Sequence, residues 1–67
     1  MEGIVKCYDD SKGYGFITIQ GNKDVFVHWS KIQEQGHRSL EAGQKVFFDL
    51  VETPKGLQAR NVIKLLF

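Results

Sequence analysis

Cysteine and long apolar runs are both scarce in this chain, and each scarcity excludes a class of protein. With Cys7 as its single cysteine, the chain can form no internal disulfide, and a free thiol suits the reducing cytoplasm. No run approaches the roughly 18 apolar residues that span a bilayer, and the first residues do not resemble a signal peptide. We therefore expect a soluble, cytoplasmic protein without a membrane partner.

An excess of charge of one sign is also lacking. The 67 residues contain 9 Lys or Arg against 8 Asp or Glu, so the formal net charge is only +1. A protein that binds nucleic acid by bulk charge alone would be strongly basic. The length allows one domain, residues 1–67, near the size at which a single core becomes marginal. Any ligand must therefore be recognised by a local arrangement of side chains.

Turn-forming residues divide the chain into short apolar or alternating segments. Five such segments are expected to be strands: residues 3–8, 14–20, 24–29, 45–52 and 57–66. A single helical turn, capped by Ser30, is expected at residues 30–33 and is followed by a polar loop. Five strands without a long helix predict an all-β, five-stranded antiparallel barrel, because closure hides the strand edges. A sandwich needs about seven strands and a longer chain.

Period-2 alternation assigns the strand side chains to two faces. One face supplies the predicted core: Ile17, Ile19, Val25, Val27, Val46, Phe48, Leu50 and Val62. Tyr14 and Phe16 in one strand, and Phe26 and His28 in the next, fall on the opposite face. These rings could instead belong to a core covered from both sides, but the aliphatic set already fills an interior of this size. We therefore expect an outward aromatic face.

Aromatic residues are concentrated on this face, because half of the eight in the chain fall within residues 14–29. Flat rings on adjacent strands form a platform for unpaired bases, and each stack contributes roughly 1–3 kcal/mol whatever the base. Duplex DNA keeps its bases stacked internally, so the expected ligand is single-stranded RNA or DNA. Lys6, Lys12 and Lys55 could meet phosphates at the ends of the platform. Gly15 lies between two outward rings, where a glycine lets a backbone or a ligand approach closely.

Two motifs in this region resemble those of a known family. Lys12-Gly13-Tyr14-Gly15-Phe16-Ile17 resembles the first ribonucleoprotein motif, and Val25-Phe26-Val27-His28-Trp29 the second, in cold-shock-domain form. Their order is the reverse of that in an RNA recognition motif, and amphipathic helices are absent. The resemblance extends over essentially the whole chain. The sequence is therefore similar to the bacterial cold-shock proteins.

The resemblance implies an OB-fold barrel that binds single-stranded RNA and DNA with low sequence specificity, often as an RNA chaperone that melts weak structure. By position it implies nucleic-acid contacts at Lys6, Lys12, Tyr14, Phe16, Asp24, Phe26, His28, Trp29, His37 and Lys55. Further candidates are Cys7, Tyr8 and Lys31. No nucleophile–base pair, phosphate-binding loop or metal-ligand spacing is present, so we expect no enzyme activity, no small-molecule substrate and no cofactor.

Four positions depart from the family pattern. Cys7 stands where most members have tryptophan, and the lost indole could weaken binding by about 1–3 kcal/mol. His37 stands where an aromatic residue is common, Ile4 where a basic residue is frequent, and Trp29 enlarges a position that is usually phenylalanine. Strand parity groups Cys7 with Val5, whereas the resemblance places it on the ligand face. A β-bulge would reconcile the two.

Phe47 and the terminal residues 65–67 add apolar groups that the core does not require. If Phe48 points inward, then Phe47 points outward. Either the tail folds over an open end of the barrel, or this surface mediates self-association or strand exchange hinged in the loop 34–44. We expect a monomer, and sedimentation from micromolar to millimolar protein would reveal a dimer. The rival to nucleic-acid binding is a protein-interaction barrel that kept the fold and lost this ligand.

Overall fold

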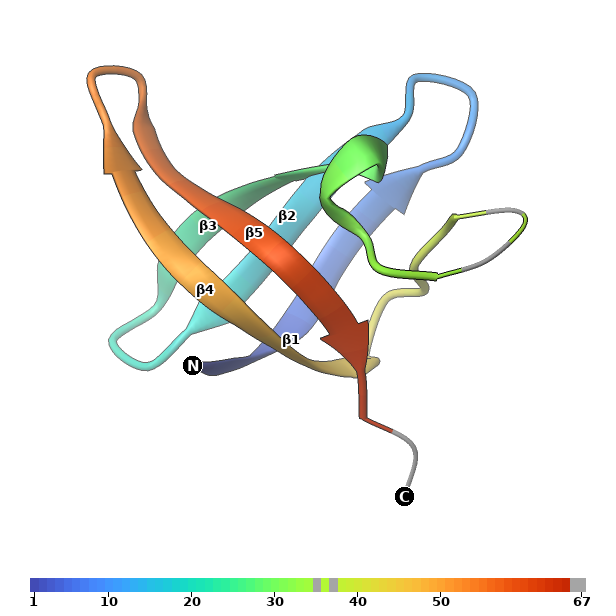
Figure 1. Ribbon diagram of the computed structural model, residues 1–67. Helices are drawn as coiled ribbons and strands as arrows, with labels where there is room; N and C mark the ends of the chain where they lie inside the picture. The colour runs from blue at the N-terminus through green and yellow to red at the C-terminus, as the bar shows by residue number, and fades with distance from the viewer. Residues whose placement is uncertain (35, 37, 66–67) are drawn as a thin grey trace.

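The computed structural model describes residues 1–34, 36 and 38–65 (Figure 1). It contains β1 (Glu2–Asp9), β2 (Tyr14–Ile19), β3 (Lys23–His28), the 3-10 turn η1 (Trp29–Lys31), β4 (Lys45–Thr53) and β5 (Gly56–Lys64). Each predicted strand agrees with an observed one to within two residues at either end. The predicted contact at His37 and the predicted course of Leu66 and Phe67 lie outside the described residues.

The strands form a closed barrel in the order β1-β2-β3-β5-β4. In Figure 1 the β4–β5 hairpin crosses in front of the β1–β2–β3 sheet. The predicted five-stranded barrel is confirmed, but one of its pairings is parallel: β3 meets β5 at Phe26 and Gln58. Strand directions can alternate around a closed ring only when the number of strands is even. A barrel of five strands must therefore contain a parallel pair, which the prediction of an antiparallel barrel overlooked.

Among the residues that the structure describes, ten hydrophobic side chains are buried in the barrel interior. Six belong to the predicted core: Ile17, Val25, Val27, Val46, Phe48 and Val62. The other four are Val5, Ile32, Leu40 and Ala59, which the sequence analysis did not include. Ile19 is only partly buried and packs against this core. The prediction of Leu50 as a core residue is wrong, because its side chain is 37% exposed.

Leu50 has the strand parity of an inward-facing residue, but it lies in the part of β4 that β1 no longer covers. The pairing of β4 with β1 covers only Glu2–Phe47, Gly3–Val46 and Ile4–Lys45. Beyond Phe48, whose backbone still bonds with Met1, β4 therefore has a neighbouring strand only on the β5 side. An inward side chain in this part of β4 faces the open end of the barrel, where Leu50 lines a shallow hollow with Met1 and Leu57.

The structure contains a β-bulge in β1. It confirms the bulge that would reconcile strand parity with the outward position of Cys7. Val5 pairs with Ile17 and Cys7 pairs with Phe16, so Lys6 is the extra residue. Val5 is buried, whereas Lys6 and Cys7 are both exposed. The extra residue reverses the parity of the strand. Cys7 consequently lies on the outer face, across from Phe16.

The 3-10 turn after β3 is capped differently from the prediction. His28, and not Ser30, is the N-cap residue: its ring nitrogen Nδ1 accepts a hydrogen bond from the backbone N–H of Ser30. The turn ends at Ile32, which is buried in the core. η1 has three residues, and no helix within residues 1–34, 36 and 38–65 is long and apolar enough to cross a membrane.

Adjacent phenylalanines in β4 provide a test of the assigned faces. Phe48 is fully buried, whereas Phe47 is 43% exposed. Replacing Phe48 by alanine leaves a cavity in the core and should lower the free energy of unfolding by about 3–5 kcal/mol. Phe47→Ala, the matched control, should change it by less than about 1 kcal/mol. Urea denaturation measures both values, and equal losses would contradict the inward orientation of Phe48.

Candidate nucleic-acid interface

Five rings gather on the outer face where β2 and β3 pair, and we call Tyr14, Phe16, Phe26, His28 and Trp29 the aromatic platform. In the antiparallel register Tyr14 faces His28 and Phe16 faces Phe26. The ring centroids of Tyr14 and Phe26 are 5.5 Å apart, and those of Phe16 and Phe26 are 5.9 Å apart in an edge-on arrangement. Such spacings are favourable for aromatic pairs. The four strand residues are half-buried, so each ring keeps part of its surface open to a ligand.

Trp29 extends the platform beyond the end of β3. Its side chain is 46% exposed, and its ring centroid lies 5.6 Å from that of His28. The guanidinium carbon of Arg38 lies 5.8 Å from the Trp29 ring centroid, within the range of a cation–π contact. Gly13 supports the indole from below, because a Cβ at that position would lie 2.6 Å from Trp29 Cδ1. Gly13 also has a φ of 77°, a conformation that favours glycine.

The edge of the platform next to β1 is formed by Cys7. Gly15, between Tyr14 and Phe16, is buried because β1 lies directly over it. A Cβ on Gly15 would collide with the carbonyl oxygen of Cys7 and lie 2.7 Å from Tyr8 Cα. The close approach predicted at this glycine is therefore made by the backbone of β1. The exposed thiol of Cys7 occupies the position beside Phe16.

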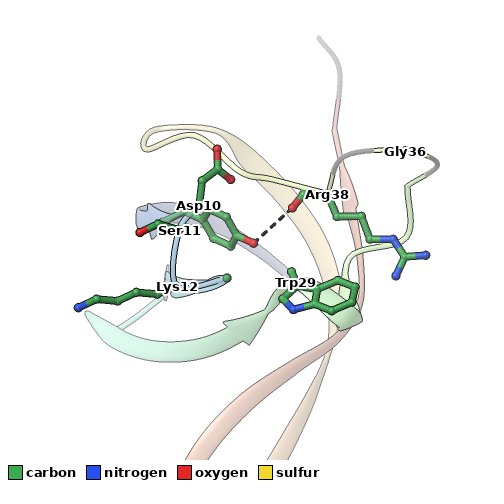
Figure 2. A pocket seen from close by; sticks show the side chains of 8 residues that line it. Asp10, Ser11, Lys12, Trp29, Gly36 and Arg38 are labelled. Carbon is green, nitrogen blue, oxygen red and sulfur yellow. Dashed lines mark hydrogen bonds between the residues drawn. The ribbon is translucent and has the colours of Figure 1, made fainter.

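Three hollows border the platform and share lining residues. The largest, of about 710 Å³, is lined by Tyr8, Asp10, Ser11, Lys12, Gly13, Trp29, Gly36 and Arg38 (Figure 2). The second, of about 330 Å³, shares Tyr8 and Lys12 with it and extends to Phe16. The third, of about 370 Å³, begins at Phe16 and ends at Lys55 and Gln58. Together they describe a continuous track across the outer face of the barrel.

Cations are placed along this track at its ends and its middle. Lys12, a predicted phosphate contact, lines the first two hollows, and Lys55, another, lines the third. Lys31 is exposed in η1 but lines none of these hollows. Arg38 lines the first, and in Figure 2 its guanidinium and the ammonium of Lys12 extend toward opposite sides of that hollow. Cations on opposite sides of the hollow are placed to meet the phosphates on either side of one stacked base.

Asp24 is held by a neighbouring cation. Lys6 Nζ lies 3.0 Å from Asp24 Oδ2, and both side chains are exposed. The hydrogen bond to Asp24 and the attraction of its charge raise the pKa of Lys6. The two residues are predicted to contact nucleic acid, and in the free protein they contact each other. The pair engages only one carboxylate oxygen of Asp24, and an exposed ion pair of this kind contributes little to stability in water.

Tyr8 and Arg38 join the barrel to the loop that follows η1. Tyr8 is half-buried, its hydroxyl donates a hydrogen bond to the carbonyl oxygen of Arg38 over 3.3 Å (dashed in Figure 2), and burial raises its pKa. Sequence reasoning missed Arg38 and Gln58 as residues of the track. Arg38 lies in an irregular loop, where side-chain direction follows no periodicity. Gln58 reaches the track through the parallel β3–β5 pairing, which was not foreseen.

Asp9 shapes the turn that leads into the platform. Its Oδ1 accepts hydrogen bonds from Ser11 N, Ser11 Oγ and Lys12 N, at 2.9, 2.7 and 3.1 Å. The Ser11 hydroxyl, followed by the backbone N–H of Lys12, lowers the pKa of Asp9. Such a carboxylate turn holds the backbone by the side chain instead of by a strand ladder. It fixes the backbone of Lys12 and leads directly into Gly13, which contacts Trp29.

A closed five-stranded barrel with half-exposed rings on two neighbouring strands defines a class of nucleic-acid-binding domain. Residues 1–65 match the family described as the 'Cold-shock' DNA-binding domain. The chain belongs to the cold-shock domain family.

Relatives of this chain come from several bacteria. It is 52% identical to cold shock-like protein CspB of Bacillus cereus over 65 residues, which cover 97% of this chain and 100% of that protein. It is 52% identical to cold shock protein CspA of Staphylococcus saprophyticus over 64 residues, which cover 96% of this chain and 97% of that protein. A solved structure of Drosophila Unr CSD456 has a TM-score of 0.77 at 20% identity, over 97% of this chain and 26% of that chain, and supports the fold alone.

Membership of this family establishes the protein as a nucleic-acid-binding, non-enzymatic cold-shock domain protein. The expected resemblance is thereby confirmed. No group of three or more His, Cys, Asp or Glu side chains within the part of the chain that the structure describes could hold a metal ion.

The turn at Asp9 generates a pH-dependent prediction. Asp9→Ala removes the acceptor of three hydrogen bonds, so the variant should melt at a lower temperature than the unmodified chain at neutral pH. Since the folded pKa of Asp9 lies below its ordinary 3.8, the stabilisation is complete above 3.8 and is lost as pH falls through the folded value. Thermal melts of the variant and the unmodified chain, followed by circular dichroism, should therefore converge as the pH falls below 3.8 and through the folded pKa of Asp9. Glu52→Ala, in β4, controls for loss of an exposed carboxylate, and a difference independent of pH would contradict the assignment.

Proposed function

We propose that this protein binds single-stranded RNA and DNA by stacking bases on the aromatic platform, with low sequence specificity. The observation that carries the proposal is the pairing of five half-exposed rings on the outside of β2, β3 and η1, away from an aliphatic core that is complete without them. Every base has a π-face, so stacking tolerates any sequence. Only unpaired strands offer those faces.

The platform is large enough for useful affinity. Each base–aromatic stack contributes roughly 1–3 kcal/mol, and the cost of ordering the strand is subtracted from the sum. About four to six base–aromatic stacks then give a dissociation constant between micromolar and nanomolar. We propose a site of about six or seven nucleotides, within the range of about 4–16 nucleotides for an OB fold. A strand held in this way cannot pair with itself, which supports a role as an RNA chaperone.

The proposed contacts fall into three groups. Bases stack on the platform residues, with His37 as a further ring; Lys6, Lys12 and Lys55 meet phosphates; and Asp24 accepts a hydrogen bond from a base edge. Cys7 and Tyr8 line the second hollow and are proposed as contacts of its nucleotide. Lys31 is proposed as a contact beyond the end of the track. Arg38 joins these by its position over Trp29.

We further propose a single domain, residues 1–67, that acts as a monomer in the bacterial cytoplasm. The lone exposed thiol and the bacterial relatives support this location. Ile4, Phe47 and Ile63 form an exposed apolar cluster, with Phe47 paired to Ile63 across β4 and β5. This cluster favours self-association as the second candidate function. Three partly exposed side chains are few beside the roughly 20–30 residues per partner of a stable interface.

Removal of platform rings tests the proposal directly. Phe16→Ala and Phe26→Ala should each weaken binding of an oligothymidine at least tenfold, because each removes a stacking surface worth roughly 1–3 kcal/mol. Quenching of Trp29 fluorescence during titration measures the affinity. Phe47→Ala is the matched control, since β4 is separated from β2 by β1 and from β3 by β5. Unchanged binding by a well-folded Phe16→Ala, Phe26→Ala double variant would refute the proposal. No quenching of the unmodified chain at high micromolar ligand would favour a protein-interaction barrel that kept the fold and lost this ligand.

Substitution of Cys7 tests whether an additional aromatic ring at this edge of the platform would strengthen binding. Cys7→Trp places an indole beside Phe16 on the exposed face of the β1 bulge. One additional stack should tighten binding by about 1–3 kcal/mol, which is roughly 5- to 150-fold. Cys7→Ser, which keeps the size of the side chain, should leave the affinity within about twofold. Titration under reducing conditions compares the variants, and an indole without effect would show that the track bypasses Cys7.

A further inference from the structure

His28 is held by a hydrogen bond that determines which of its ring nitrogens carries the proton. Its Nδ1 lies 3.3 Å from the backbone nitrogen of Ser30, whose N–H donates to it, and 2.8 Å from Ser30 Oγ. A backbone N–H can only donate, so Nδ1 must present its lone pair. In the neutral imidazole one ring nitrogen is the acceptor and the other is the donor. The bond from the Ser30 N–H is consistent with the form that carries its hydrogen on Nε2, and in that form the Ser30 hydroxyl donates to Nδ1.

The geometry of the ring turns this N–H away from η1. Nδ1 and Nε2 lie on different sides of the imidazole, so a ring whose Nδ1 contacts Ser30 points its Nε2 away from that residue. Among the described residues, no hydrogen-bond partner for Nε2 is found. His28 lies across from Tyr14 and beside Trp29, in the middle of the aromatic platform. Phe16 and Phe26 offer ring faces without any polar group.

We infer that His28 is a directional hydrogen-bond donor, held in its Nε2–H form by the backbone of Ser30, and that it binds an oxygen acceptor of the nucleic-acid strand. The acceptor is a base carbonyl oxygen or a phosphate oxygen, which share the lone pairs that a neutral N–H seeks. The inference rests on the proposed function and adds direction to it. Stacking tolerates every base, whereas a fixed donor favours strands that present an oxygen at this place.

The form of the ring is measured in the unmodified, free protein. Long-range ¹H–¹⁵N correlation spectroscopy distinguishes a protonated ring nitrogen from an unprotonated one. We expect Nε2 to be protonated and Nδ1 unprotonated in the neutral ring, and the same pattern in Ser30→Ala, which keeps the backbone N–H. A proton on Nδ1 of the neutral ring would overturn the inference. This measurement needs no ligand, so it remains decisive even if the chain fails to bind single strands and the proposed function is wrong.

The acceptor is identified by titrating His28→Phe, which keeps an aromatic ring and removes the donor. Loss of one neutral hydrogen bond should weaken binding about fivefold. A loss with hexathymidine alone assigns the acceptor to the base, because thymine has carbonyl oxygens and adenine has none. An equal loss with hexathymidine and hexaadenosine assigns it to the phosphate that both strands share. Ser30→Ala, the matched control, should bind both strands like the unmodified chain, and undiminished binding of both by His28→Phe would overturn the inference.

Discussion

The register between β2 and β3 is the constraint on which the rest of this structure depends. It places Phe16 opposite Phe26 and Tyr14 opposite His28 on the outside, and Ile17 opposite Val25 on the inside. Because side chains alternate with a period of two, a slip by one residue would move every ring into the core and every aliphatic residue into water. The same pairing therefore specifies the core and the platform together. Neither could be changed without the other.

Closure of the barrel brings the remaining parts of the track to this pair of strands. The parallel contact between β3 and β5 places Gln58, and with it the third hollow, beside Phe26. On the other side, the bulge at Lys6 turns Cys7 outward while Val5 stays in the core. At the end of β3, the cap made by His28 begins a turn that leaves Trp29 exposed and buries Ile32. Each irregularity thus extends the platform in one direction.

The regular part of this structure could be predicted from the sequence, and the irregular part could not. Alternation in residues 14–20 and 24–29 gave the outward rings, because each strand there is uninterrupted. The burial of Leu50 was predicted wrongly because parity says which way a side chain points but not where the neighbouring strand ends. The cap at His28 was missed because an imidazole nitrogen can replace the Ser, Thr, Asp or Asn oxygen that usually marks a helix start. Arg38 was missed because its place over Trp29 depends on the course of a loop.

The near-neutral net charge reflects the pairing of basic and acidic side chains on the surface. Lys6 is paired with Asp24, Lys45 with Glu2 and Lys64 with Glu34, so several cations of the chain are already compensated by a neighbour. The cations that line the track are Lys12, Arg38 and Lys55. Affinity that depends on released counterions scales with the number of phosphates neutralised, which would be small in the proposed complex. In that complex the rings would therefore supply most of the binding free energy, and the core that holds them in place before a strand binds lowers the cost of ordering.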